Sequence, residues 1–208
     1  MQNELSPRRS QAERTKLSKA KIIKEANRIF GENGFHGTRM SDIAREAGLT
    51  GPGLLHHFSC KEDLLIAVLE NRDQTDQKRL EELFGNLDSN QTLQTLQTLV
   101  EYNQTAPEMV RLFTILVTES IAFDHPGHEF FVERYRNYRG LYIDLMRKYQ
   151  DEGHIRKDID VEHISMIMMA MMDGMQIQWL LDPDQVDMAA TFKVFLKIFS
   201  LGVKETAS

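Results

Sequence analysis

The side chains in this sequence that could do chemistry are hydrogen-bond donors and acceptors, and they gather in residues 38–61. That stretch reads TRMSDIAREAGLTGPGLLHHFSCK and holds two threonines, two arginines, two adjacent histidines and a lysine. Hydroxyl, imidazole and cationic groups of this kind bind phosphate oxygens and base edges. The residue types in this stretch therefore favour binding over catalysis.

The rest of the chain offers little catalytic chemistry. No pairing of a nucleophile with an activating base stands out, and no glycine-rich phosphate loop appears. His125 and His128 flank a Pro-Gly turn, but no cysteine or carboxylate supports them as metal ligands. We therefore predict that the protein is not an enzyme and has no metal site and no cofactor.

Apolar spacing in residues 38–61 predicts two short helices joined by a tight turn. Gly48 suits the end of the first helix, because glycine readily adopts the left-handed backbone found there. Thr50 is a good N-cap for the second helix, and Pro52 fits its first turn. The apolar positions that would face a core are Met40, Ile43, Ala44, Ala47, Leu54 and Phe58. Two short helices around a glycine turn are the helix-turn-helix plan, whose second helix lies in the DNA major groove.

Residues 22–69 resemble the TetR family of bacterial one-component repressors. The resemblance covers about a quarter of the chain, and its spacing is specific to the family. The matching positions are Ile22, Ile23, Ala26, Phe30, Asn33, Gly34, Phe35, Thr38, Asp42, Ile43, Ala44, Ala47, Gly48, Leu54, His56, Phe58, Lys61, Glu62, Leu64 and Leu65.

The resemblance implies which residues contact DNA. Carried over by position, they are Thr38, Thr50, Gly51, Pro52, Gly53, Leu55, His56, His57 and Lys61. Relatives commonly have lysine, glycine and threonine at positions 51–53, and tyrosine at positions 55 and 57. Because two of these positions are glycine here, direct base readout would fall to Thr50, Arg39 and His57. We therefore expect more dependence on DNA shape and phosphate contacts than is usual in the family.

Charge is divided unevenly along the chain. The 208 residues carry a net charge of −6. Residues 1–61 hold 11 Lys/Arg against 6 Asp/Glu, whereas residues 62–208 hold 14 against 25. A basic head on an acidic body suits a protein that places its head on phosphate. Chance clustering of surface charge is the alternative.

The remaining sequence reads as helices separated by turns, without strand-like alternation, and predicts an all-α fold of about nine helices. Helices are expected over residues 18–33, 61–84, 128–152, 161–181 and 187–202, with shorter ones from residues 92 and 107. We divide the chain into a flexible arm (1–17), a helix-turn-helix DNA-binding domain (18–63) and an effector-binding and dimerisation domain (64–208). The arm either reaches neighbouring phosphates or has no role.

Residues 163–179, HISMIMMAMMDGMQIQW, are apolar on nearly all sides and predict a helix that is buried all round. Ordinary core packing is the simpler interpretation of its methionines. Methionine also suits the wall of an irregular ligand pocket. The candidate lining residues of such a pocket are Tyr102, Phe113, Val117, Tyr135, Tyr142, Met168, Met172, Gln176 and Trp179.

The family resemblance also implies that the last two long helices pair with those of a second subunit. Small residues at two positions would permit close approach, and phenylalanines at helical spacing would form the shared core. The candidate interface residues are Ala170, Gly174, Met188, Phe192, Phe195 and Phe199.

Together these patterns predict a ligand-responsive transcriptional repressor. A homodimer would bind a near-palindromic double-stranded DNA operator and be released by a small, partly hydrophobic effector that is neutral or weakly polar. The alternative is a small-molecule-binding protein of the same fold with weak or lost sequence-specific DNA binding. One cysteine, no apolar signal segment and no apolar run of about 18 residues predict a cytoplasmic protein without a membrane partner.

Overall fold

The computed structural model describes residues 10–84 and 92–204, and over these ranges the chain forms nine α-helices and no strand. The helices are α1 (Gln11–Gly37), α2 (Met40–Glu46), α3 (Gly51–Leu55), α4 (Lys61–Phe84), α5 (Thr92–Gln104), α6 (Pro107–Glu119), α7 (His128–Asp151), α8 (Val161–Leu181) and α9 (Met188–Val203). The all-α prediction is confirmed, and most helices begin and end close to their predicted bounds.

The main difference lies at the start of α1, which begins at Gln11 rather than at Ser18. Ser10 and Glu13 form a capping box there. The Ser10 hydroxyl accepts a hydrogen bond from the Glu13 N–H at 3.2 Å, and the Glu13 carboxylate accepts one from the Ser10 N–H at 2.9 Å. This reciprocal cap satisfies two N–H groups at the helix start. The predicted flexible arm is therefore wrong for residues 11–17, while residues 1–9 lie outside the described residues.

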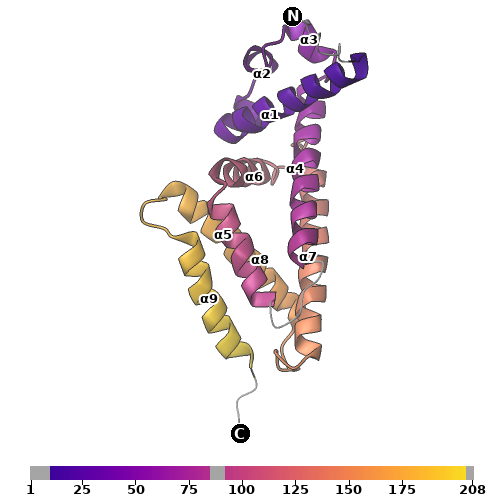
Figure 1. Cartoon of the computed structure of the whole chain (residues 1–208). Helices are drawn as coiled ribbons and strands as arrows, with labels where there is room; N and C mark the ends of the chain where they lie inside the picture. The colour runs from indigo at the N-terminus through magenta and orange to yellow at the C-terminus, as the bar shows by residue number, and fades with distance from the viewer. Residues whose placement is uncertain (1–9, 85–91, 205–208) are drawn as a thin grey trace, which may run out of the picture.

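Helices α1–α3 form a head at one end of the molecule (Figure 1). Helix α6 lies across the base of this head, beneath α1. The long helices α4 and α7 run side by side along one edge, and α5, α8 and α9 form the rest of the body. Ion pairs from Arg134 of α7 to Asp73 and Asp76 of α4 hold the two long helices together.

One apolar core joins the head to the start of α4 and to the body. Its fully buried members include Ile22, Phe30, Ile43, Leu64 and Leu65, from α1, α2 and α4. Residues of α6 and α7 belong to the same core, among them Leu112, Leu116 and Phe131. The head is therefore seated on α6 and α7 as well as joined to α4. The predicted domain boundary between residues 63 and 64 falls inside α4.

A second core lies among α5, α7, α8 and α9. Its most buried members include Leu96, Met146, Met168 and Phe192. Most methionines of α8 pack here or beside it, but α8 is not buried all round. One face leaves Ile167 57% and Leu181 80% exposed.

Helix α8 is also, by length and composition alone, long and apolar enough to cross a membrane. The prediction that no apolar run reaches this length is therefore corrected for Val161–Leu181. The core helix of a soluble protein passes the same test, and 39% of the most apolar window of α8 is buried inside the molecule.

Candidate functional site

Helices α2 and α3 present a polar surface at the tip of the head. The Thr50 hydroxyl accepts a hydrogen bond from the Gly53 N–H at 3.1 Å and so caps α3. Leu54 is 1% exposed and anchors α3 to the core, whereas the neighbouring Leu55 is 52% exposed. The predicted DNA contacts that are exposed here are Arg39, Thr50, Gly51, Pro52, Leu55 and His56, with Gly53 and His57 half-buried.

Two predicted DNA contacts, Thr38 and Lys61, turn inward instead. Thr38 is 2% exposed, and its hydroxyl donates to the carbonyl oxygen of Gly34 at 2.6 Å. This corrects the prediction that Thr38 contacts DNA. The Lys61 ammonium donates to the carbonyl oxygens of Phe35 at 2.7 Å and Thr38 at 3.0 Å. Lys61 therefore holds the turn between α1 and α2.

The same turn is tied to the body by Glu119, the last residue of α6. The Glu119 carboxylate accepts a hydrogen bond from the Phe35 N–H at 2.7 Å. Gly34 has φ +70° and ψ 178°, a backbone region that is essentially restricted to glycine. A Cβ atom at position 34 would also overlap the Glu119 carboxylate. Conformation and space therefore both require glycine where the head meets α6.

His125 packs under this contact as a neutral side chain. It is 4% exposed, and its ring lies edge-on to Phe35 with the centroids 5.1 Å apart. Its Nδ1 accepts the Gly127 N–H at 3.1 Å and lies 2.8 Å from the Ser120 hydroxyl, which is then the donor. Burial lowers the pKa of His125. Over residues 10–84 and 92–204, no three His, Cys, Asp or Glu side chains gather as potential metal ligands.

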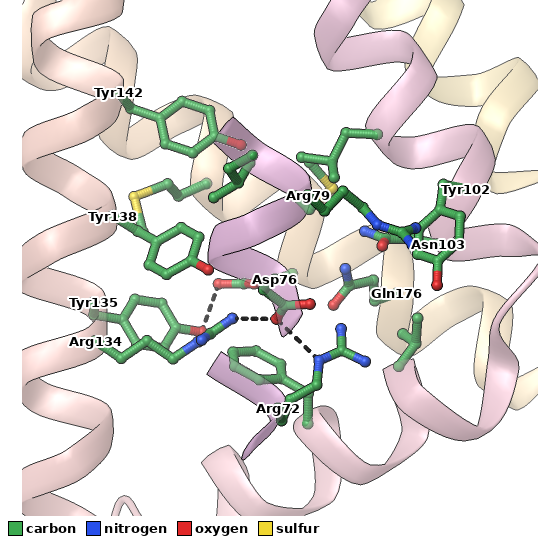
Figure 2. Close-up of a pocket in the computed structure, with 17 residues that line it drawn as sticks. Arg72, Asp76, Arg79, Tyr102, Asn103, Arg134, Tyr135, Tyr138, Tyr142 and Gln176 are labelled. Carbon is green, nitrogen blue, oxygen red and sulfur yellow. Dashed lines mark hydrogen bonds and ion pairs between the residues drawn. The ribbon is translucent and has the colours of Figure 1, made fainter. Parts of the chain in front are cut away.

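The second candidate site is a cavity lined by α4, α5, α6, α7 and α8 and open to solvent on one side (Figure 2). Counted out to the solvent at its mouth, its volume is about 820 Å³. Its polar lining consists of Arg72, Asp76, Arg79, Asn103, Arg134, Asp173 and Gln176. Its aromatic lining consists of Tyr102, Phe113, Tyr135, Tyr138 and Tyr142. Its aliphatic lining consists of Leu80, Leu99, Val110, Met169 and Met172.

Asp76 is the centre of the charged wall. Its carboxylate accepts hydrogen bonds from Arg72 Nε at 2.9 Å and from Arg134 Nη2 at 2.8 Å (Figure 2). All three side chains are at most 15% exposed. Burial raises the pKa of Asp76, although Arg72 works in the opposite direction. Two guanidinium groups thus converge on one carboxylate in a largely dry environment.

Two arginines in this wall keep donors that no described acceptor uses. Arg72 Nη1 is buried and has no hydrogen-bond partner. Arg79 lies over the Tyr102 ring, 3.1 Å from its centroid, and forms no ion pair with a carboxylate of the described residues. In Figure 2, Arg79 lies beside Tyr102 and Asn103, across the cavity from the tyrosines of α7.

The tyrosines of α7 line the opposite wall. The Tyr135 hydroxyl donates to the Asp173 carboxylate at 2.8 Å. Burial raises the pKa of Tyr135, Tyr138 and Tyr142, so all three are neutral at physiological pH. Burial also raises the pKa of Asp173. The wall therefore offers aromatic faces and neutral hydroxyl groups.

Six of the nine predicted pocket residues line this cavity, namely Tyr102, Phe113, Tyr135, Tyr142, Met172 and Gln176. The other three do not. Val117 packs against the core that joins the head to α4, α6 and α7. Met168 and Trp179 belong to the second core, among α5, α7, α8 and α9. Sequence reasoning missed the charged wall entirely, because the polar middle of α4 reads as solvent-exposed. The available signal was the spacing of Arg72, Asp76 and Arg79, which puts all three on one helix face.

Of the predicted dimer residues, some are buried in the chain's own core and others are at least partly exposed. Met188 and Phe192 are 0% and 1% exposed within the single chain, so they pack in its own core, which corrects their assignment to an interface. Phe195 and Phe199 are half-buried beside the same core, Gly174 is half-buried and Ala170 is exposed. An apolar face of the two helices is exposed, formed by Met166, Ile167, Ile177 and Leu181 of α8 and by Val194, Ile198 and Leu201 of α9. Ala170 and Gly174 lie within the α8 part of this face, at helical spacing with Ile167 and Ile177.

A helix-turn-helix tip joined by one helix to a cavity with a polar and aromatic lining is the plan of a one-component regulator, in which a single chain both senses a ligand and binds DNA. The chain belongs to the TetR family of bacterial regulatory proteins. Residues 22–68 match the family model described as bacterial regulatory proteins, tetR family. Residues 93–197 match the model of the BetI-type transcriptional repressor C-terminal region.

Similar proteins agree with this assignment. The probable transcriptional regulator ArpR of Pseudomonas putida is 27% identical over 182 residues, which cover 85% of this chain and 86% of that protein. The repressor KstR2 of Rhodococcus jostii strain RHA1 is 28% identical over 146 residues, covering 69% and 71%. A regulator from Saccharomonospora viridis, solved with choline, shares the fold with a TM-score of 0.76 at 22% identity, covering 92% of this chain and 100% of that one. The predicted family and function are confirmed: this is a TetR-type repressor with an N-terminal DNA-binding region and a C-terminal ligand-binding region.

Proposed function

We propose that this repressor works in the cytoplasm as a homodimer that holds a near-palindromic operator and releases it when an effector enters the cavity. One observation carries the proposal: α4 belongs to both sites. Leu64 and Leu65 are fully buried in the core that α4 shares with the head. Two to four turns further on, Arg72, Asp76 and Arg79 of the same helix line the cavity.

An effector can act through α4 only if it favours one position of that helix. A ligand held by the α4 arginines on one side and by α7 and α8 on the other sets the position of α4 in the body. That position is passed to the head, because Leu64 and Leu65 are locked into its core. Release of DNA then requires tighter effector binding to the form that does not fit the operator, typically by about 1–3 kcal/mol of coupling.

The exposed apolar face of α8 and α9 supports the homodimer. Contiguous apolar surface on a soluble protein commonly marks an interaction site. A two-fold axis through this face would pair each helix with its copy and set two heads side by side. Two such heads would meet major grooves about 34–36 Å apart, which is why the operator should be near-palindromic.

The exposed tip residues support DNA contact by α3. Arg39, Thr50, Leu55 and His56 are exposed at the tip and are the side chains that we expect to meet a groove. Burial lowers the pKa of His57, and the nearby His56 and Lys19 lower it further, so His57 is neutral near pH 7. Gly51, the first residue of α3, is exposed and carries no side chain that would shield its backbone N–H, which suits phosphate contact.

The first test is DNA binding itself. Labelled duplex from upstream of the chain's own coding sequence is titrated with full-length protein and followed by fluorescence anisotropy. Arg39→Ala should weaken binding severalfold, whereas Arg139→Ala, an exposed arginine on α7, should leave it unchanged. Absence of binding by the unaltered protein at low salt would favour the alternative, a ligand-binding protein with a non-reading head.

The second test separates dimer formation from folding. Ile198→Glu places a charge in the exposed apolar face without touching the body core. We expect a monomer by analytical ultracentrifugation, an unchanged helical circular dichroism spectrum and weaker operator binding. Glu substitution at Lys193, an exposed position on another side of α9, is the control. A variant that remains a dimer would place the interface elsewhere.

The chemistry of the effector is the remaining part of the proposal. The Saccharomonospora viridis regulator was solved with choline, so a cation is one candidate. The cavity here is lined by three arginines and two aspartates, together with aromatic and aliphatic side chains. A partly hydrophobic effector with a polar end therefore fits better than the neutral or weakly polar one expected from sequence.

A further inference from the structure

We propose that the effector of this cavity is an anion, a carboxylate carried on a flat aromatic body, and that Arg79 and Arg72 bind its carboxylate. The inference rests on the proposed function, because it concerns the ligand of the same cavity. It draws on four features of the cavity: unused donors, engaged carboxylates, covered aromatic faces and an apolar wall.

The unused donors call for an acceptor. Arg72 Nη1 is buried without a hydrogen-bond partner, and a buried donor in that state is costly. Arg79 forms no close ion pair with a carboxylate of the described residues, although its charge acts to lower the pKa of Asp76, and its guanidinium lies over the Tyr102 ring. A guanidinium group offers parallel N–H donors that match the two oxygens of a carboxylate. A ligand carboxylate in this part of the cavity would satisfy donors that the protein leaves open.

The carboxylates of the cavity are already engaged. Asp76 accepts hydrogen bonds from both Arg72 and Arg134, and Asp173 accepts one from the Tyr135 hydroxyl. A cationic ligand would have to displace one of these partners. It would also lie near three guanidinium groups of its own sign, which is unfavourable in a poorly hydrated space.

The aromatic faces that would form a cage for a quaternary ammonium are covered by the protein's own cations. Arg79 lies 3.1 Å from the centroid of Tyr102. Arg134 lies 4.4 Å from the centroid of Tyr138 and 5.1 Å from that of Phe113. Recognition of quaternary ammonium groups depends on such faces being free. The arginines therefore occupy faces of three of the five aromatic rings in the lining, which disfavours this mode of binding.

The rest of the cavity suits a flat apolar body. Val110, Met169 and Met172 add apolar side chains to the lining, and Tyr142 lies away from Arg72 and Arg134 (Figure 2). Aromatic rings gain from offset or edge-to-face packing on tyrosine, and methionine adapts to the outline of what it covers. An aromatic acid would thus place its ring on this wall and its carboxylate on α4.

Three probes with one ring system and different charges test the inference. Naphthalene-2-carboxylate, naphthalene-2-carboxamide and 2-naphthylmethylammonium are titrated into the full-length protein by calorimetry. We expect the carboxylate to bind at least about tenfold more tightly than the other two, because it alone forms charge-assisted hydrogen bonds with the arginines. The ammonium binding most tightly, or none of the three binding at millimolar concentration, would overturn the inference.

Variants assign the effect to the cavity. Arg79→Gln should weaken carboxylate binding about tenfold and leave amide binding unchanged, and Arg79→Lys should restore part of the loss. Arg139→Gln makes the same change of charge on the exposed surface of α7 and should have no effect. Circular dichroism and the unfolding midpoint verify that each variant is folded. Unchanged carboxylate affinity in a folded Arg79→Gln protein would contradict the assignment.

DNA release measured in parallel keeps this inference separate from the proposed function. Tight carboxylate binding that depends on Arg79 but leaves the operator complex intact would support the anionic ligand and contradict the release mechanism. DNA release caused by the ammonium probe would support the release mechanism and contradict the anionic ligand.

Discussion

Two buried polar clusters lie along this molecule, one at the junction of head and body and one in the cavity, and they differ in how completely they are satisfied. At the junction, Glu119 meets the Phe35 N–H and Lys61 meets two carbonyl oxygens. In the cavity, Arg72 Nη1 has no acceptor and Arg79 has no described carboxylate partner.

The junction cluster is therefore a structural contact, whereas the cavity cluster is able to bind a ligand. At the junction, charged side chains meet backbone groups of a turn that has one allowed geometry, which fixes the head on α6. In the cavity, charged groups at the ends of long side chains pair with one another, and some arginine N–H donors are left without an acceptor. We therefore expect changes at the junction to reduce stability and changes in the cavity to alter ligand binding with little effect on stability.

The largest effect is expected where α4 joins the head. Leu64→Ala removes a fully buried side chain and should lower the free energy of unfolding by about 3 kcal/mol. It should also weaken effector-induced release, because the head would follow α4 less closely. Urea unfolding and anisotropy of labelled operator measure the two effects, and Leu80→Ala in the cavity wall is the comparison. Effector release that survives intact would show that α4 is not the lever.

The next effect concerns the glycine at the junction. Gly34→Ala forces an alanine into a positive-φ conformation and against the Glu119 carboxylate, and it should cost about 2–3 kcal/mol of stability. Gly140→Ala is the matched control, since position 140 lies on α7 with open space around it. That change should stabilise the protein by roughly 0.5–1 kcal/mol. Equal changes in stability for the two substitutions would contradict a special requirement for glycine at the junction.

A charge-removing pair compares the two clusters directly. Glu119→Gln keeps an acceptor for the Phe35 N–H but loses the charge-assisted bond, and it should cost about 1 kcal/mol. Arg79→Gln in the cavity should change stability by less than about 0.5 kcal/mol. Chemical denaturation of both proteins measures the difference, and a larger loss from Arg79→Gln would reverse our interpretation of the clusters.

The smallest effect is a dependence of stability on pH. Burial raises the pKa of Asp173 above its ordinary value of 3.8, so the folded state binds its proton more tightly than the unfolded state does. The stabilising contribution of that proton is fully present below the unfolded pKa and is lost as the pH rises through the folded pKa. Asp173→Asn should remove this loss and gain stability relative to the native sequence as the pH is raised above 3.8. A difference in unfolding free energy between the two proteins that stays the same at every pH would contradict this prediction.

Much of the head could be predicted from sequence because its signals are local. The α2–α3 turn, the Thr50 cap and the buried Leu54 follow from glycine, capping and spacing within a few residues. The start of α1 was missed although Ser10 and Glu13 are a readable capping box. Thr38 was misassigned because its acceptor, the Gly34 carbonyl, depends on how the chain folds back after α1.

The cavity shows where local reasoning ends. Tyr135 and Gln176 were predicted from aromatic and polar residues on apolar helices, and both line it. Arg72 and Arg134 were not, because a polar residue on a helix reads as exposed until a distant helix covers it. The interface prediction failed at Met188 and Phe192 for the same reason: an apolar stripe does not say which neighbour it packs against.

The sequence alone determined the helical class, the helix-turn-helix and the family, since periodicity, caps and motif spacing act over a few residues and survive without knowledge of packing. Only the tertiary structure decided that Asp76 gathers two arginines, that Glu119 holds the head, and which faces of α8 and α9 stay exposed. Those outcomes depend on helices far apart in the chain meeting in space, where burial changes the energetic value of every charge.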